Sequence, residues 1–294
     1  MSGRDVGDGS VPVLYAADLD GTLLNDRAQL SPVSRRILVE LMGQGLLLTV
    51  ASGRSVVAIR QLLAGVALRL PVIEFNGSFL SDLASGRHLR THALGASAAV
   101  EIYELARSAG HRPFVSTYDG ERDRLYAPPA ANPGIEWYVG DRRANGDERL
   151  TPVADPAAGL ADEVVCLTVI GEETPLRCLD EAVRSRWHGQ VQLHLQENRY
   201  SRGWHWLTVH DRRATKDQAM RALLELEDLT GAEVVAFGDE ANDLGLFDLA
   251  DRAVAVGNAV DELKKRADAV IGPNNEDSVA RYISQDWRRR GPRR

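Results

Sequence analysis

Two aspartates, Asp18 and Asp20, end a run of apolar residues and have a single leucine between them. Residues two apart on an extended chain face the same way, so both carboxylates can point into one pocket. Two carboxylates about 4 Å apart repel each other by roughly 4 kcal/mol at an effective dielectric constant of 20. We therefore expect a shared proton, a metal ion or a nearby cation to offset this repulsion.

A second acidic stretch, Gly238-Asp239-Glu-Ala-Asn242-Asp243, follows another buried apolar run in the same manner. Ligands of open α/β sheets bind at the carboxyl ends of the strands, where both stretches are expected to lie. Asp18, Asp239 and backbone oxygen offer hard ligands, which suit Mg²⁺ rather than zinc. The predicted metal ligands are Asp18, Asp20, Asp239 and Asp243.

Lys216 opens a predicted helix and is one of only three lysines in a chain that has 32 arginines. Its compact ammonium suits a phosphate or an aspartyl-phosphate as a point charge. Ser52 adds a hydroxyl donor after a second buried strand, and Gly53 allows close approach of the backbone. Arg54 is predicted either to bind substrate or to pair with a nearby carboxylate.

Together these residue types indicate phosphoryl transfer. In this hypothesis Asp18 attacks phosphorus, and Asp20 protonates the leaving oxygen and then takes a proton from the attacking water. Lys216 is the third catalytic residue, and Asn242 with Asp243 orients the groups around the metal. The predicted substrate-binding residues are Ser52, Gly53, Arg54, Lys216 and Asn242.

The apolar runs alternate with helical patterns at both ends of the chain, which favours a doubly wound parallel sheet. Ser31 and Ser55 are predicted to cap the first two helices, and Asn76-Gly77 is predicted to form a hairpin turn. The expected strands are 11–17, 46–51, 71–75, 234–237, 253–256 and 269–271. The expected helices start at Pro32 and Ser55 and cover 216–226 and 260–266.

The pattern between these two halves suits an antiparallel sheet covered by helices on one face. Helices are expected at 96–108 and 175–187, strands at 112–116, 164–170, 191–196 and 204–209, and mostly loop from the first of these strands to about 156. The predicted fold class is therefore α/β. A Rossmann-like core of residues 1–82 and 210–294 carries an inserted α+β cap domain of residues 83–209.

The 294-residue chain has a formal net charge of -7, which argues against a nucleic-acid or anionic-membrane surface. No apolar run reaches the ~18 residues of a membrane span, and the N-terminus has no apolar signal segment, so we expect a cytoplasmic protein. Cys166 and Cys178 are predicted to be free thiols of a reducing compartment. The basic end, 287–294, is predicted to be a solvated tail.

Four motifs resemble those of the haloacid dehalogenase-like superfamily of aspartate-nucleophile phosphatases. They are Asp18-Leu-Asp20-Gly-Thr-Leu-Leu24, Ser52-Gly53-Arg54, Lys216 and Gly238-Asp239-Glu-Ala-Asn242-Asp243. The interval between Ser52 and Lys216 has room for a cap, as in the Cof-like, type-IIB subfamily. Phe75-Asn76-Gly77-Ser78 is similar to that subfamily's exit into the cap, and residues 255–270 with 275–280 are similar to its closing signature.

This resemblance implies a Mg²⁺-dependent phosphatase of small phosphorylated metabolites, either sugar phosphates or phosphorylated cofactors, with the cap choosing the substrate. A phosphotransferase such as a hexose phosphomutase and a non-catalytic binding protein are the alternatives. The intact set of Asp18, Asp20, Lys216 and Asp239 disfavours the non-catalytic protein. Ser278 stands where the signature usually has glycine, so a positive φ there would be strained. Trp204 and Trp206 share one strand face, opposite His205, and are expected to pack against cap helices rather than on substrate.

Overall fold

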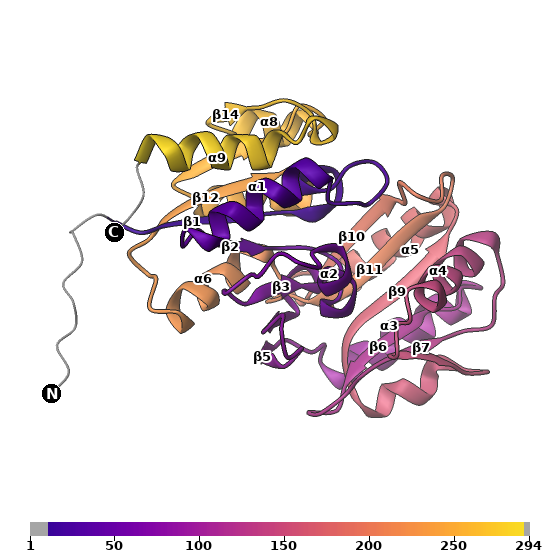
Figure 1. Cartoon of the computed structure of the whole chain (residues 1–294). Coiled ribbons are helices and arrows are strands. Elements are labelled where there is room, and N and C mark those ends of the chain that lie inside the picture. The colour runs from indigo at the N-terminus through magenta and orange to yellow at the C-terminus, as the bar shows by residue number, and fades with distance from the viewer. Residues whose placement is uncertain (1–10, 291–294) are drawn as a thin grey trace, which may run out of the picture. The chain divides into compact units, whose positions relative to one another are not determined.

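A computed structural model describes residues 11–290 of the chain (Figure 1). These residues divide into a core unit, 11–88 with 216–290, and an inserted unit, Leu89–Thr215. The boundaries between the units lie a few residues beyond the sequence-based ones, 82/83 and 209/210. Strand β11 (His205–Asp211) ends beyond the second of those points, and the first division falls within β5 (His88–Thr91), directly after His88. We describe β5 with the core unit because it shares a sheet with the two strands that precede it in the chain.

The core unit alternates strands and helices, and we keep one set of labels in chain order. Its elements are β1 (Val13–Ala17), the turn η1 (Leu19–Leu23), α1 (Pro32–Gly43), β2 (Leu47–Val50), α2 (Val56–Leu62), β3 (Val72–Glu74), the turn η2 (Phe75–Gly77), β4 (Phe79–Ser81), β5 (His88–Thr91), α6 (Lys216–Leu226), β12 (Glu233–Gly238), the turn η4 (Ala241–Asp243), α7 (Leu244–Leu249), β13 (Arg252–Ala255), α8 (Asp261–Arg266), β14 (Ala269–Val270), the turn η5 (Asn274–Glu276) and α9 (Ser278–Arg290).

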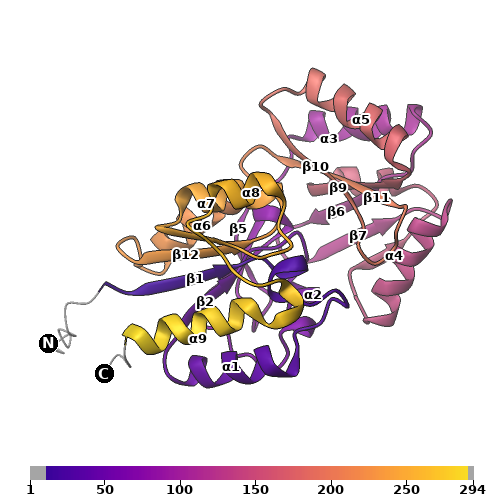
Figure 2. The ribbon, with the colours of Figure 1, turned by 90° about the horizontal axis from the view of Figure 1, so that it is seen from above.

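A five-stranded parallel sheet in the order β14-β13-β12-β1-β2 forms the centre of the core unit. Helices α1 and α9 lie side by side on one face, and α6, α7 and α8 lie on the other (Figure 2). All five residues of β1 are buried, which explains its uninterrupted apolar run. This doubly wound arrangement confirms the predicted fold class of the core.

Local signals position the elements around this sheet as predicted. The side chain of Ser31 accepts a hydrogen bond from the backbone N of Ser34, and Ser55 does the same for Ala58, so each caps its helix. The third predicted strand, β3, instead forms the edge of a separate three-stranded sheet in the order β3-β4-β5, in which it pairs with β4. An isolated parallel β-bridge between Ala51, which follows β2, and Ile73 of β3 connects this small sheet to the main one.

The basic end of the chain differs from the prediction of a solvated tail, because residues 287–290 belong to α9. Trp287 is buried, and its Nε1 donates to Oε1 of Gln44 at 3.0 Å. Arg290 pairs with Glu233 and Asp286. Charged residues therefore make up most of this segment, but one face of α9 packs against α1. Residues 291–294, and the N-terminal residues 1–10 on which the expectation about a signal segment rested, lie outside the described residues.

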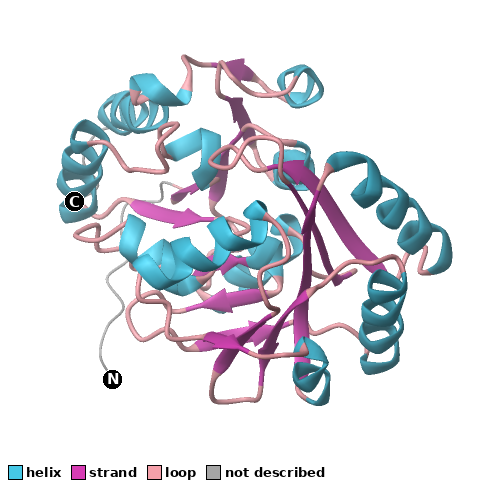
Figure 3. Cartoon of the chain, turned by 90° about the vertical axis from the view of Figure 1, so that its right-hand side faces the viewer, coloured by secondary structure: helices cyan, strands magenta, loops and turns pink. Residues whose placement is uncertain are grey.

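The inserted unit contains a six-stranded sheet in the order β10-β11-β9-β6-β7-β8, antiparallel except for the parallel pair β7 and β8. Figure 3 draws the strands of both units in magenta and the helices in cyan. Its elements are α3 (Ala96–Ser108), β6 (Phe114–Tyr118), β7 (Asp123–Ala127), α4 (Pro133–Ala144), β8 (Leu150–Pro152), the turn η3 (Pro156–Ala161), β9 (Glu163–Gly171), α5 (Glu173–Arg186), β10 (Val191–Glu197) and β11 (His205–Asp211).

Two predictions for this unit were wrong. The stretch expected to be mostly loop contains β7, α4 and β8, and helices cover both faces of the sheet, with α3 and α5 opposite α4 (Figure 2). Asn132 caps α4 by accepting a hydrogen bond from the backbone N of Ile135 at 2.8 Å, and Pro133 follows at the first helical position. Asn132 and Pro133 are thus signals for the start of a helix. The many prolines and arginines around them had favoured the prediction of a loop. Across the residues that the structure describes, no helix has the length and apolarity to cross a membrane.

Candidate active site

The turn after β1 places Asp18 at the carboxyl edge of the core sheet. The backbone N of Asp18 donates to the carbonyl of Phe237 at 3.0 Å, and the N of Leu24 closes the turn on the carbonyl of Leu19 at 2.9 Å. Gly21 has φ of 77°, which glycine adopts without steric cost. The chain therefore bends sharply after Asp18 and brings it beside the end of β12.

Three carboxylates gather at this edge. Asp18, Asp239 and Asp243 are buried, and each offers an oxygen within 4.8 Å of those of the other two. Lys216, the first residue of α6, inserts its ammonium among them. Its Nζ donates to Oδ1 of Asp18 at 2.6 Å and to Oδ1 of Asp243 at 2.7 Å. Of the three expected ways to offset the repulsion at Asp18, the structure shows a nearby cation.

Burial and charge act in opposite directions on the groups in this cluster. Burial by itself would lower the pKa of Lys216, but the carboxylates of Asp18 and Asp243 raise that pKa above its usual value. Burial raises the pKa of Asp18 well above its usual value; Lys216 opposes this rise, while Asp243 and Asp239 add to it. One ammonium therefore leaves the negative charge of three carboxylates incompletely balanced.

The residues present fit a divalent cation. The donor set is all oxygen, buried and preassembled, and it carries more negative charge than Lys216 neutralises. Such a set suits a hard ion such as Mg²⁺. A cation held there would favour the ionised form of Asp18, the form that a nucleophile requires.

The carboxylate of Asp243 is held by hydrogen bonds to both of its oxygens. Its Oδ2 accepts from the backbone N of Asp239 at 3.0 Å and of Glu240 at 3.2 Å, while its Oδ1 accepts from Lys216. A Cβ at position 238 would lie 2.6 Å from side-chain atoms of Asp243, so the contact requires glycine there. Asp243 thereby holds the backbone around Asp239, whose carboxylate also accepts from Thr22 Oγ1 at 3.2 Å.

Ser52, Gly53 and Asn242 are joined through Asn76, a residue that the sequence reasoning had not assigned to the site. The backbone N of Asn76 donates to the carbonyl of Ser52 at 2.9 Å, and the side chain of Asn242 donates to Oδ1 of Asn76 at 3.1 Å. A Cβ on Gly53 would be 3.4 Å from the Asn76 amide. The Asn-Gly pair close after a buried strand was the signal for Asn76, but it was interpreted as a turn and as the exit into the cap, not as part of the site.

Asp20 differs from the other three predicted metal ligands, because its carboxylate is not part of the cluster. It pairs with Arg54 through two parallel hydrogen bonds, from Nε to Oδ2 at 2.6 Å and from Nη2 to Oδ1 at 2.7 Å. Of the two alternatives for Arg54, the structure shows the pairing with a nearby carboxylate. The two residues connect the loops that follow β1 and β2.

A segment near the C-terminus holds the turn that carries Asp20. Asn258 Nδ2 donates to the carbonyl of Gly21 at 2.7 Å, and Asn274 Nδ2 donates to that of Leu24 at 2.9 Å. The condition for strain at Ser278 is not met, because the positive φ, 60°, falls on Asp277. The side chain of Asp277 accepts from Ser34 Oγ at 2.8 Å and so ties this segment to α1.

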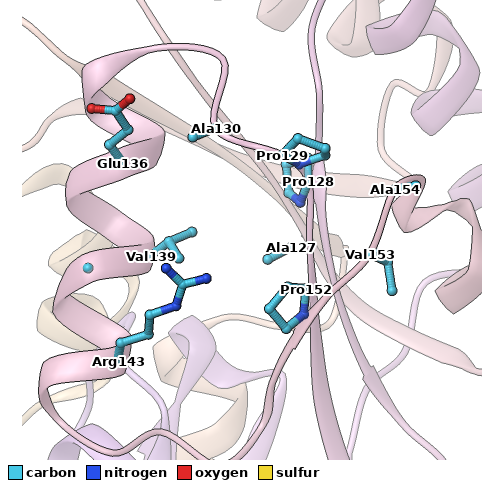
Figure 4. Close-up of a pocket in the computed structure, with 11 residues that line it drawn as sticks. Ala127, Pro128, Pro129, Ala130, Glu136, Val139, Arg143, Pro152, Val153 and Ala154 are labelled. Carbon is cyan, nitrogen blue, oxygen red and sulfur yellow. The ribbon is translucent and has the colours of Figure 1, made fainter.

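Trp204, which precedes β11, and Trp206 on β11 both pack in the apolar cluster under α4 in the inserted unit, as expected. Trp206 is buried, with its ring centroid 6.1 Å from those of Trp137 and Tyr138 on α4. His205 faces the other way, 3.9 Å from Glu173 of α5. A cavity of about 440 Å³ lies beside α4, where Glu136, Val139 and Arg143 face the proline-containing ends of β7 and β8 (Figure 4). It contains none of the predicted site residues.

Comparisons with known proteins relate the chain to a family and a fold. The family model of the haloacid dehalogenase-like hydrolases matches residues 15–283. The pyridoxal phosphate phosphatase YbhA of Escherichia coli (strain K12) is 27% identical over 275 residues, covering 92% of this chain and 97% of that protein. The 5-amino-6-(5-phospho-D-ribitylamino)uracil phosphatase YwtE of Bacillus subtilis (strain 168) is 26% identical over 288 residues, with 92% and 96% covered. A crystal structure titled as a haloacid dehalogenase-like hydrolase from Bacteroides thetaiotaomicron has a similar fold, with a TM-score of 0.77 at 24% identity, covering 94% of this chain and 100% of that one.

Proposed function

Because this chain belongs to the haloacid dehalogenase-like hydrolases, as its four motifs indicated, we propose that it is a Mg²⁺-dependent phosphatase that works through an aspartyl-phosphate. The observation that carries the proposal is the buried cluster in which Lys216 joins Asp18 and Asp243 next to Asp239. A carboxylate held against an ammonium at the end of a parallel strand is suited to attack phosphorus.

In the first step, an oxygen of Asp18 bonds to phosphorus while the bond from phosphorus to the ester oxygen breaks. Asp20 gives its proton to that leaving oxygen. In the second step, water attacks the phosphorus of the aspartyl-phosphate, Asp20 accepts a proton from the water, and Asp18 is released with inorganic phosphate. The proton returns to Asp20, so the cycle balances.

Other residues of the core unit would bind the phosphoryl oxygens. Lys216 supplies a full positive charge beside Asp18, and Ser52 supplies a hydroxyl from the loop after β2. Asp18 and Asp239 would hold the metal ion together with backbone oxygen, while Asp243 orients them. When bound, Mg²⁺ would neutralise charge on the phosphoryl oxygens.

The proposed substrates are small phosphate monoesters. Two relatives are named as phosphatases of pyridoxal phosphate and of 5-amino-6-(5-phospho-D-ribitylamino)uracil. The proposed substrates therefore include phosphorylated cofactors as well as sugar phosphates. The proposal includes a cytoplasmic location and no nucleic-acid or membrane partner, in keeping with the net charge of -7.

A screen of phosphorylated metabolites tests this function. Sugar phosphates, pyridoxal phosphate and nucleoside monophosphates are incubated with the protein and Mg²⁺, and inorganic phosphate is measured. We expect release from at least one of them, lost in EDTA and in Asp18→Asn. Conversion to an isomeric ester at constant total ester would instead identify a phosphotransferase, and no turnover of any ester would contradict catalysis.

A further inference from the structure

We infer that Arg54 is the positioning residue of Asp20, the group that exchanges protons with the leaving oxygen and the attacking water. This inference deepens the proposed function and rests on it, because it concerns proton transfer at the same site. It assigns Arg54 a role through another side chain, in place of direct binding of substrate.

The geometry of the pair supports this role. Two parallel hydrogen bonds, 2.6 and 2.7 Å long, join the Nε–Nη2 edge of Arg54 to both oxygens of Asp20. A planar fork that engages both oxygens fixes the direction as well as the distance of a carboxylate. A single ammonium at the same place would leave the carboxylate free to rotate.

The backbone holds both partners of the pair in place. The backbone N of Arg54 donates to Ser52 Oγ at 3.2 Å, and its carbonyl accepts from the N of Phe75 at 3.1 Å. The next residue, Ser55, caps α2. On the other side, Asp20 precedes Gly21, whose carbonyl is held by Asn258. The fork therefore connects two anchored loops and can set the position of Asp20.

The same contacts argue against Arg54 as a phosphate ligand in this arrangement. Its Nε–Nη2 edge, which would clasp a phosphate through two hydrogen bonds, is occupied by Asp20. Lys216 already provides the cation beside the nucleophile. Loss of a ligand and loss of a positioning residue have different kinetic consequences, because only the second depends on whether the leaving group needs a proton.

The test compares two substrates in full-length protein with Mg²⁺. An alkoxide leaves only with a proton, whereas p-nitrophenolate leaves without one, and kcat/KM reports the steps up to departure of the leaving group. For Arg54→Ala, we expect kcat/KM to fall about 10- to 100-fold with the alkyl phosphate that is turned over fastest, and less than about threefold with p-nitrophenyl phosphate. Arg54→Lys should not restore the alkyl rate. Arg36→Ala, exposed on α1, should match the wild type.

A double-mutant cycle separates the possible outcomes. Arg54→Ala should add little to the loss already caused by Asp20→Asn, since both changes remove the same proton transfer. Equal losses with both substrates, or restoration by lysine, would overturn the inference in favour of a ligand or a charge effect. If Asp20→Asn itself kept full activity with the alkyl phosphate, the failure would lie in the proposed function.

Discussion

The Nζ atom of Lys216 lies 2.6 Å from Oδ1 of Asp18, although 198 residues separate them in the sequence. The first turn of α6 and the end of β1 bring them together, and the same ammonium also contacts Asp243. One buried cation thus stabilises a cluster of three buried carboxylates. This arrangement makes the stability of the core unit depend on the charges at its active site.

Lys216→Met tests that dependence, because methionine retains an apolar stem and removes the charge. Without metal, Asp18 and Asp243 would lose their buried partner, and breaking such a pair typically costs about 3–5 kcal/mol. We expect a fall of this size in the free energy of unfolding, measured in urea with EDTA. Arg221→Met on the exposed side of α6 is the control. A variant as stable as the wild type would show that the lysine is not needed to balance the cluster.

Magnesium should stabilise the wild-type protein, because it binds the folded acidic cluster. At a concentration 100 times its Kd, a ligand adds about 2.7 kcal/mol to stability. Asp239→Asn should reduce this increment and the phosphatase activity together, while Glu225→Gln, exposed on α6, should retain both. Thermal unfolding with and without Mg²⁺ measures the effect. An identical increase in Tm for Asp239→Asn would place the ion elsewhere.

The sequence predicted the cluster because its members stand at the ends of buried strands or at the start of a helix, where an α/β fold brings side chains together. It did not predict which way Asp20 would turn, since the pairing with Arg54 depends on how two loops are anchored by Asn258 and Asn76. Helix α4 and the end of α9 were missed because each has few apolar residues. The prolines and arginines around α4 and the arginines after Trp287 favoured a loop or a tail instead.

His210 should make the inserted unit sensitive to acid. Burial, with a smaller contribution from His194, lowers its pKa to about 3, against about 6.5 in the unfolded chain. Between these values the unfolded chain binds a proton that the folded chain does not, so stability falls as the pH drops below 6.5. This amounts to about 2 kcal/mol at pH 5. Between pH 7 and 5, the free energy of unfolding measured in urea should therefore fall less for His210→Gln than for the wild type. For His188→Gln, whose side chain is exposed, it should fall as in the wild type. Equal slopes for all three proteins would contradict the assignment.

Gly134→Ala tests the packing of α4 on the sheet. A Cβ at this position would lie 2.8 Å from both Ile170 Cγ2 and Trp204 Cγ, so the helix would have to shift. Such overpacking typically costs about 1–3 kcal/mol. Gly140→Ala, in the same helix with nothing within 4 Å, should instead be neutral or stabilising. Urea unfolding followed by tryptophan fluorescence compares the two, and equal stabilities would mean that α4 does not pack closely at Gly134.

Chemical trapping during turnover tests most directly whether Asp18 captures the phosphoryl group. Borohydride reduces an acyl phosphate, so quenching the reaction with it converts a phosphorylated aspartate into homoserine. We expect mass spectrometry to find this change at Asp18 alone, only when substrate and Mg²⁺ are both present. Modification at Asp20 or another residue, or an unmodified Asp18 under conditions of active turnover, would contradict the account.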